Sequence, residues 1–199
     1  AIETVPRASI PQSPVQPAPP APVAPAGEKV VETEEDTRKT VAMAARSEWK
    51  DLYSQARYGE ALVAAEREGF DGLLLTTDLG DLWALADAAR MARNPGKAGK
   101  ALNAVRQRFA GTTRARTAAY FLGKVSMDLE GNPAEASRWF EIYCREDPDG
   151  RLSEEALGWL IEARTKSSQK AAAKDAARRY LQKYPAGTFS DLAKSVLGE

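Results

Sequence analysis

The sequence contains no histidine and only one cysteine, Cys144, among its 199 residues. Histidine is the commonest general base and the commonest metal ligand in proteins, so its absence removes the usual routes to acid–base catalysis and metal binding. A single thiol forbids an internal disulfide and any site built from several thiolates. We interpret Cys144 as a buried, inert thiol, because nothing nearby in sequence is strongly placed to lower its pKa. We therefore expect no catalytic residues, no metal and no other cofactor.

The sequence also lacks a long apolar run and an excess of charge of either sign. No stretch approaches the roughly 18 apolar residues that a transmembrane helix needs, so we expect no direct membrane insertion. The 28 basic residues balance the 28 acidic ones and the pI is near 6.7, so no overall field draws the protein to nucleic acid. Because the chain begins at Ala1 rather than methionine, we expect a processed protein or an excised fragment.

Proline is concentrated at the N-terminus, where seven prolines lie between Pro11 and Pro25. Such a segment cannot bury a core and samples extended polyproline II conformations. We interpret residues 1–33 as a disordered Pro/Ala-rich linker that acts as a tether. The spacing of Pro11, Pro14 and Pro17 also matches the loose PxxP form that aromatic grooves bind, which leaves a docking motif as an alternative. The acidic patch from Glu32 to Asp36 suits the first turn of a helix.

Residues 34–199 are expected to be all-α, because apolar residues recur at helical spacing and no alternating strand pattern is present. Residues that typically end or begin helices divide this region into antiparallel helix pairs. Gly131 suits the end of one helix, Asn132 caps the next and Pro133 fits its first position. Asn94 and Pro95 repeat this arrangement about 38 residues earlier, which indicates a repeat protein.

Four helix pairs and a final short helix are predicted, with Phe70 to Thr77 as the least regular connection and Leu73 to Leu75 filling a gap there. A turn is expected at Arg57-Tyr58-Gly59. The predicted helices cover residues 37–56 with a partner that begins at Glu60 and ends at Gly69, then 78–93 with 95–109, 114–130 with 133–146, 153–165 with 169–184, and 190–197. The apolar residues expected to face inward are Val41, Ala44, Ala45, Trp49, Leu52, Leu82, Leu85, Ala86, Ala89, Ala98, Leu102, Val105, Ala119, Leu122, Val125, Leu129, Ala136, Phe140, Tyr143, Cys144, Leu157, Leu160, Ile161, Ala173, Ala177, Tyr180 and Leu181.

This pattern resembles the tetratricopeptide repeat family, whose unit is a helix pair of roughly 34 residues. The matching marks are Trp49 with Leu52, the run from Ala56 to Leu62, the run from Gly131 to Ala136 with Phe140 and Pro148, and Leu157-Gly158 with Ala173 and Pro185. The resemblance implies an α-solenoid of about four antiparallel helix pairs over residues 34–199, with a C-terminal capping helix. It departs from the family in its slightly long repeats and in the fourth turn, which lacks the glycine and reads Lys166-Ser167-Ser168-Gln169.

More loosely, a Pro/Ala-rich tether ahead of divergent repeats is similar to the envelope-facing regions of bacterial FecR-type or anti-sigma regulators and to periplasmic repeat lipoproteins. That resemblance implies a periplasmic or cell-envelope location and a protein partner.

The outward faces of the first helices line the concave groove in this family, and they carry the candidate site. Three aromatic residues sit off the main inward stripe of their helices, within a polar frame that is typical of peptide-binding hot spots. Core packing between repeats is the alternative for each aromatic residue. The predicted partner-binding residues are Trp83, Asp87, Arg90, Tyr120, Lys124, Glu155 and Trp159.

The favoured function is a non-enzymatic scaffold that binds a protein or peptide through its repeat surface. The alternative is a structural segment whose repeats self-associate within a larger sensor. An enzyme is disfavoured: Glu155 and Glu162 share a helix face, as solvated surface residues commonly do, and the Gly96 to Lys100 run lacks the P-loop spacing. Lys170, Lys174 and Arg178 form a basic column at four-residue spacing, which we interpret as a solubilising face, with a docking strip for an acidic partner as the alternative.

Overall fold

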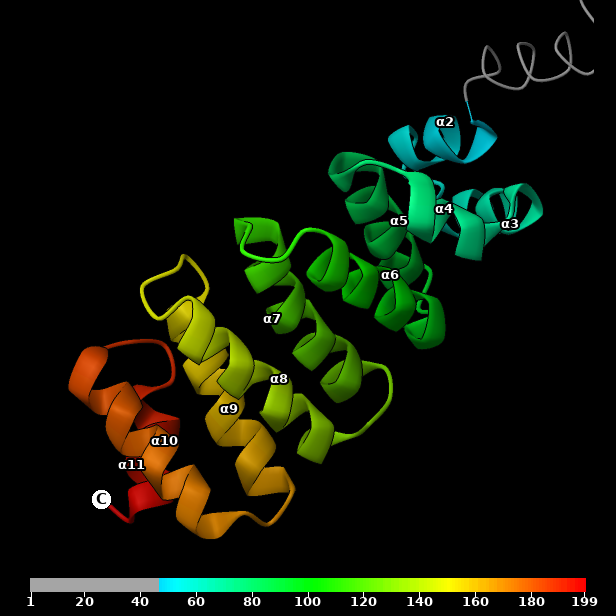
Figure 1. Cartoon of the computed structure of the whole chain (residues 1–199). Coiled ribbons are helices and arrows are strands. Elements are labelled where there is room, and N and C mark those ends of the chain that lie inside the picture. The colour runs from blue at the N-terminus through cyan, green and yellow to red at the C-terminus, as the bar shows by residue number, and fades with distance from the viewer. Residues whose placement is uncertain (1–46) are drawn as a thin grey trace, which may run out of the picture. The chain divides into compact units, whose positions relative to one another are not determined.

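The computed structural model describes residues 47–199, and every regular element among them is an α-helix (Figure 1). The predicted all-α class is therefore confirmed for this range. The Pro-rich segment, the acidic patch and the expected inward residues Val41, Ala44 and Ala45 lie outside the described residues. The helices are α2 (Glu48–Ser54), α3 (Tyr58–Glu68), α4 (Phe70–Thr76), α5 (Leu79–Met91), α6 (Pro95–Arg108), α7 (Thr113–Asp128), α8 (Pro133–Glu146), α9 (Ser153–Lys166), α10 (Lys170–Lys183) and α11 (Ser190–Leu197).

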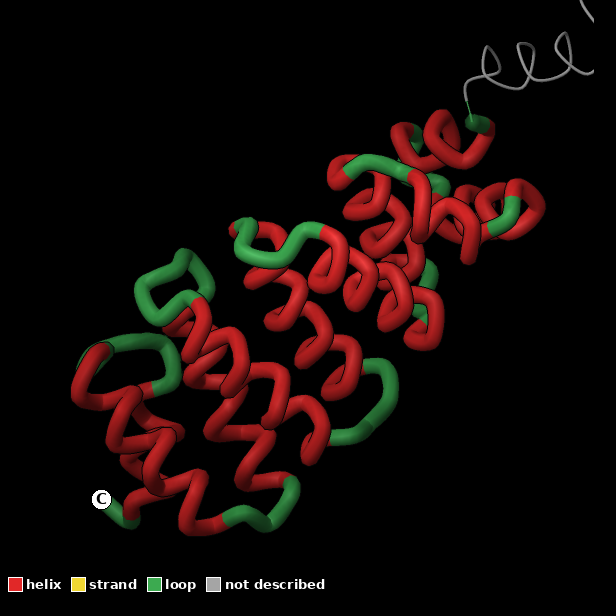
Figure 2. The backbone as a smooth tube through the Cα atoms, in the orientation of Figure 1, coloured by secondary structure: helices red, strands yellow, loops and turns green. Residues whose placement is uncertain are grey.

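Four pairs of helices, α2–α3, α5–α6, α7–α8 and α9–α10, are each joined by a tight turn of the same kind. One residue with a left-handed backbone, φ between 54° and 62°, directly precedes the residue that caps the second helix in every pair. These residues are Ala56, Arg93, Gly131 and Ser168, and successive ones lie 37, 38 and 37 residues apart. Figure 2 shows the turns within the last three pairs on one side of the helices and the loops between pairs on the other.

Local sequence explains where the helices begin. The side chains of Asn94 and Asn132 accept hydrogen bonds from the backbone N–H groups of Lys97 and Glu135, each at 3.1 Å. Proline occupies the first position of both α6 and α8, where no intrahelical N–H is lost. Each cap contributes about 1 kcal/mol to helix stability. The predicted starts of these two helices are confirmed.

The connection around α4 differs from the prediction. Residues 70–76 form a helix rather than an irregular loop, because Gly69 (φ 99°) turns the chain sharply and Phe70 and Leu74 then bury one helical face. Leu75 fills no gap, since 74% of its surface is exposed. The predicted turn at Arg57-Tyr58-Gly59 is also misplaced: Tyr58 and Gly59 belong to α3, and Ala56 supplies the left-handed residue.

The core consists of two apolar clusters that share α7. Ala118, Leu122 and Val125 of this helix pack toward α5 and α6, whereas Ala119 and Tyr120 pack toward α8 and α9. Burying one large side chain of this kind contributes about 1.5–3 kcal/mol. The predicted inward residues of the described range are buried, except that Leu52, Leu129 and Leu181 are only partly buried at the edges of the clusters.

Helix α11 packs against both α9 and α10. Its predicted bounds, residues 190–197, are confirmed. The segment leading into it is fixed by Tyr180, whose hydroxyl accepts a hydrogen bond from the Phe189 N–H at 2.9 Å and donates one to Glu154 at 2.9 Å. The buried Tyr180 on α10 and the partly exposed Glu154 on α9 thus hold the start of the last helix.

Candidate functional site

The first helices of successive pairs are joined by polar and aromatic side chains, which we call the first-helix face. It begins between α2 and α5, where the Tyr53 hydroxyl donates to Asp87 at 3.4 Å and Lys50 forms an ion pair with Asp81. Burial and the Asp87 carboxylate raise the pKa of Tyr53, so its hydroxyl stays protonated and remains a donor. The face consists of Tyr53, Trp83, Asp87, Arg90, Arg114, Tyr120, Phe121, Lys124, Glu155 and Trp159.

Between α5 and α7 the face is an aromatic pair flanked by two cations. The rings of Trp83 and Phe121 meet edge to face, with their centroids 5.7 Å apart. The Arg90 guanidinium lies 3.9 Å from the centroid of Phe121, and the Arg114 guanidinium lies 5.3 Å from the ring centroid of Trp83. Arg90 is also held by Asp87 at 2.7 Å. Each cation–π contact of this kind contributes about 0.5–1 kcal/mol at an exposed site.

Between α7 and α9 the same combination recurs with lysine in place of arginine. The Lys124 ammonium lies 3.4 Å from the ring centroid of Trp159 and 2.9 Å from a carboxylate oxygen of Asp128. Beside it, the Tyr120 hydroxyl donates to Glu155 at 2.9 Å. Burial, followed by the hydrogen bond to the Glu155 carboxylate, raises the pKa of Tyr120 far above its ordinary value. This hydroxyl is a fixed donor and not a general base.

The structure places six of the seven predicted residues on the surface of this face, at least in part. Tyr120, the seventh, is buried rather than on the surface. Only 6% of Tyr120 is exposed, and its ring packs against Phe140 and Tyr143 of α8 at centroid distances of 5.8 and 5.9 Å. Tyr120 acts from within the core by holding Glu155 in position.

Three members of the face, Tyr53, Arg114 and Phe121, were missed by the sequence prediction. Tyr120 and Phe121 are adjacent aromatic residues, and consecutive side chains on a helix point about 100° apart. Either one could have faced outward; the structure buries Tyr120 and leaves Phe121 partly exposed. Tyr53 and Arg114 carry no local signal, because each acquires its role only through contact with α5.

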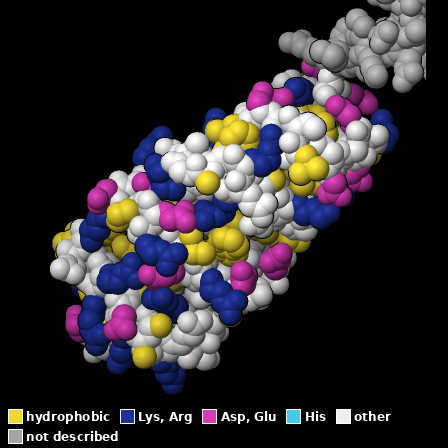
Figure 3. All heavy atoms as spheres, in the orientation of Figure 1, with side chains coloured by type: hydrophobic (Ala, Val, Ile, Leu, Met, Phe, Trp, Pro, Cys, Tyr) yellow, Lys and Arg dark blue, Asp and Glu magenta, His cyan; other side chains and the backbone are white. Residues whose placement is uncertain are grey.

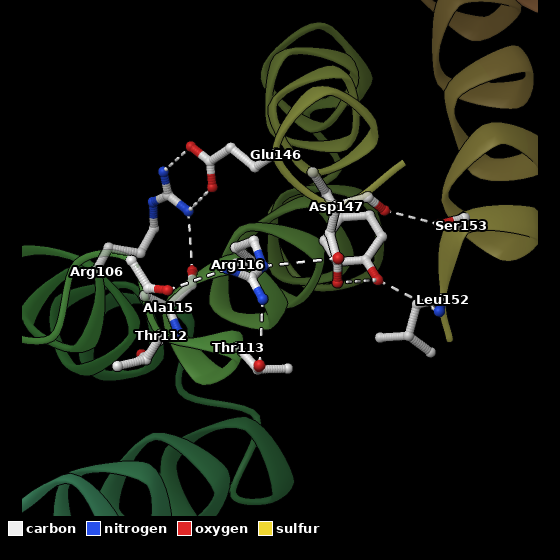
Figure 4. A network of polar contacts seen from close by, with 11 residues as sticks. Arg106, Thr112, Thr113, Ala115, Arg116, Glu146, Asp147, Leu152 and Ser153 are labelled. Atoms are coloured by element: carbon white, nitrogen blue, oxygen red, sulfur yellow. Dashed lines mark hydrogen bonds and ion pairs between the residues drawn. The ribbon is translucent and has the colours of Figure 1, made fainter. Parts of the chain in front are cut away.

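A second group of close polar residues lies around the start of α7 and is shown in Figure 4. Arg106 pairs with Glu146 through two hydrogen bonds of 2.8 and 3.0 Å and also donates to the Ala115 carbonyl at 2.9 Å. The hydrogen bonds from Arg106 hold the pKa of Glu146 below its usual range. Arg116 lies 3.6 Å from Asp147, next to the α8–α9 turn. These charges bind each other across α6, α7 and α8, so we interpret the group as a structural contact that holds the three helices together.

A cavity of about 410 Å³ lies between α8, α9 and α10, with Cys144 among its lining residues. Arg179 and Lys183 also line it, but both are ion-paired. The Arg179 guanidinium lies 2.9 Å from a carboxylate oxygen of Glu141, and the Lys183 ammonium lies 2.7 Å from a carboxylate oxygen of Asp149. Burial raises the pKa of the Cys144 thiol to about 12, so thiolate is negligible near neutral pH. The structure gives this cavity no activated nucleophile.

Within residues 47–199, no group of three or more Cys, Asp or Glu side chains is arranged to hold a metal ion. No helix in the same range is long and apolar enough to cross a membrane. Comparison of the chain with protein-family models, curated proteins and solved structures gave no match.

Proposed function

We propose that residues 34–199 form an α-solenoid of the tetratricopeptide type, a non-enzymatic scaffold that binds a protein or peptide along the first-helix face. The repeated turn geometry supports the architecture, because left-handed residues recur every 37 or 38 residues at equivalent places in four helix pairs. Solenoids of this kind present extended binding surfaces made from equivalent helices.

The observation that carries the binding proposal is the repetition of one motif at successive junctions. A tryptophan with a cation against its ring stands between α5 and α7 as Trp83 with Arg114, and between α7 and α9 as Trp159 with Lys124. Trp and Arg are enriched among residues that dominate binding energy at interfaces. Both tryptophans are partly exposed, so a bound segment would contact the ring edges and the cations together.

The experiment is selection of binders from a library of random peptides displayed on phage, followed by isothermal titration calorimetry with the selected peptides. Arg114→Glu is the test variant, since Arg114 is exposed and lies against the Trp83 ring. Arg145→Glu is the matched control on α8. We expect Arg114→Glu to weaken binding about tenfold, or about 1.4 kcal/mol, and the control to bind like the wild type. Equal affinities for all three proteins would refute the assignment of the face.

The location that we propose is the periplasm or another compartment of the bacterial cell envelope, with residues 1–33 as a disordered tether. The support is the loose resemblance to envelope-facing regulators and lipoproteins together with the Pro/Ala-rich composition of that segment. A fusion to alkaline phosphatase, which is active only after export, tests this when the gene is expressed with its natural upstream sequence. An inactive fusion that is expressed at normal levels would place the protein in the cytoplasm.

Self-association within a larger sensor is a second candidate, favoured by exposed apolar residues on the earlier helices. Val63 on α3 is 50% exposed, and Leu75 on α4 is 74% exposed. Single exposed apolar residues are common on monomers, so this candidate ranks second. Light scattering over a concentration series, with Leu75→Lys as the variant, tests it. A wild type that stays monomeric at high concentration would rule out strong self-association.

A further inference from the structure

The second helices of the pairs alternate in charge along the chain. Helix α3 carries three acidic residues and one basic residue, and α8 carries three acidic and two basic. In contrast, α6 carries four basic residues and no acidic one, and α10 carries five basic residues and one acidic. Ion pairs connect these helices in order, so that each acidic helix lies beside a basic one.

Helix α6 shows how a basic second helix uses both of its flanks. Lys97 pairs with Glu66 of α3 on one side at 2.5 Å, and Arg106 pairs with Glu146 of α8 on the other at 2.8 Å. Helix α8 in turn offers Glu141 to Arg179 of α10 at 2.9 Å. Every flank between two second helices is thus occupied by charges of opposite sign.

Helix α10 has only one flank occupied in this way. Arg179 faces Glu141 of α8, whereas Lys170, Lys174 and Arg178 lie along another side at four-residue spacing, which places them on one helical face. All three are exposed. Among residues 47–199, Lys170 and Lys174 have no carboxylate within ion-pair distance, and Arg178 meets only the exposed Asp175 of its own helix.

Position along the helix shows which way this basic flank points. Arg178 is the ninth residue of α10, and Glu141 is the ninth residue of α8. Glu141 contacts arginines of the two helices that follow α8 in the chain, Arg164 and Arg179. Arg178 therefore points toward the place where a further second helix would lie beyond α10.

Helix α11 stands next to that place. It packs mainly against α10, as α7 and α9 pack against the second helices that precede them, α6 and α8. The partly buried Leu181 and Val196 lie on α10 and α11. In Figure 3 lysine and arginine side chains gather over the region of α8 to α10.

We propose that the basic flank of α10, formed by Lys170, Lys174 and Arg178, is a docking surface for an acidic amphipathic helix of a partner protein. The bound helix would occupy the place of a second helix beside α11, with carboxylates one turn apart facing the three cations. Charge complementarity sets the choice of partner, because acidic helices already pair with both α6 and α10 within the chain. This surface is distinct from the first-helix face, so either proposal can fail alone.

The test uses the full 199-residue chain and a fluorescein-labelled helical peptide with an alanine background and glutamate at every fourth position. Matched peptides carry glutamine or lysine at those positions. The test variant is Lys170→Glu/Lys174→Glu/Arg178→Glu. The control, Arg138→Glu/Arg145→Glu/Arg151→Glu, changes the net charge equally through exposed arginines elsewhere. Circular dichroism melting shows that each variant is folded before fluorescence anisotropy is recorded.

We expect the glutamate peptide to bind the wild type and to bind the test variant at least about tenfold more weakly, with the control within about twofold. The test variant should also gain affinity for the lysine peptide, which loss of folding cannot produce. Absence of binding to the wild type at about 1 mM peptide would overturn the proposal, as would equal weakening in both variants. The last measurement uses a peptide of residues 28–41, which bear this chain's acidic patch. If that peptide binds more tightly than the designed one, the proposed ligand is a second copy of the chain and not a partner protein, and the proposal is overturned.

Discussion

Replacing Tyr180 with phenylalanine tests whether α11 is held by the hydrogen bonds that converge on one buried hydroxyl. Tyr180 is fully buried. Its hydroxyl donates to Glu154 at 2.9 Å and accepts from the Phe189 N–H at 2.9 Å, while the same Glu154 carboxylate accepts from the Thr188 N–H at 2.8 Å. Tyr180→Phe removes two of these three bonds and leaves the ring in place.

The expected cost follows from the two lost bonds. A hydrogen bond to a charged group contributes about 1.5–3 kcal/mol, and a buried N–H left without an acceptor costs about 1–3 kcal/mol. Glu154 keeps its bond to Thr188 and remains partly in contact with water, so the lower ends of these ranges apply. We expect Tyr180→Phe to lower the free energy of unfolding by about 2.5 kcal/mol.

Guanidinium unfolding followed by circular dichroism measures this change, and hydrogen exchange locates it. Amides of α11 should exchange faster in the variant, whereas those of α5 and α6 should not. Tyr58→Phe is the matched control, because the Tyr58 ring packs on Tyr53 and its hydroxyl has no hydrogen bond among the described residues. A loss below about 0.5 kcal/mol, within the usual range for surface substitutions, or unchanged exchange in α11 would refute the reasoning.

Three further predictions concern packing, turn geometry and the thiol. Gly158→Ala should destabilise the protein by about 1–3 kcal/mol in denaturant unfolding, because the new Cβ would lie 2.3 Å from the ring of Phe189; a neutral substitution would show that this contact relaxes freely. Gly131→Ala should cost about 1–2 kcal/mol at its left-handed position, whereas Ser168→Gly at the equivalent turn should stabilise the protein; equal effects of one sign would contradict the shared turn geometry. Cys144, whose pKa is raised to about 12 by burial, should react with Ellman's reagent at pH 8 only after unfolding, and rapid reaction of the native protein would disprove its burial.

Helix boundaries were predictable where the cause is local. A cap and a proline act within one turn of the residues they affect, so Asn94-Pro95 and Asn132-Pro133 located the starts of α6 and α8 from the sequence alone. The same logic could not locate the other turns. Ala56 and Ser168 adopt the left-handed conformation without being glycine, because the packing of the helices on either side fixes the turn.

Helix α4 was missed for a related reason. Its seven residues include Gly72, and a helix this short has little intrinsic stability. Burial of Phe70 and Leu74 against the neighbouring helices holds it, and that contact joins residues far apart in the sequence. The three consecutive leucines suggested an apolar plug, but one helical face can bury only some of them.

The first-helix face was predictable in its two tryptophans and not in the contacts that they make. Trp83 and Trp159 stood out because they lie off the apolar stripe of their helices. The cations against them could not be assigned from sequence, since Arg114 and Lys124 both lie on α7 and reach tryptophans of two different helices. Helix α7 is thus the shared support of both junctions, through Phe121 as well as through its two cations.

The cations change what the face can recognise. The sequence suggested open aromatic surfaces in a polar frame, yet in the structure Arg90 lies 3.9 Å from the centroid of Phe121 and Lys124 lies 3.4 Å from that of Trp159. A ring covered by a cation offers its remaining edge, and the cation offers its unused donors. The Lys124 ammonium has three donors, and Asp128 engages it at 2.9 Å. In the binding role that we propose for this face, carboxylate or carbonyl oxygens of a ligand would accept from the cation without displacing the aromatic contact, whereas a purely apolar peptide would have to move the cation first.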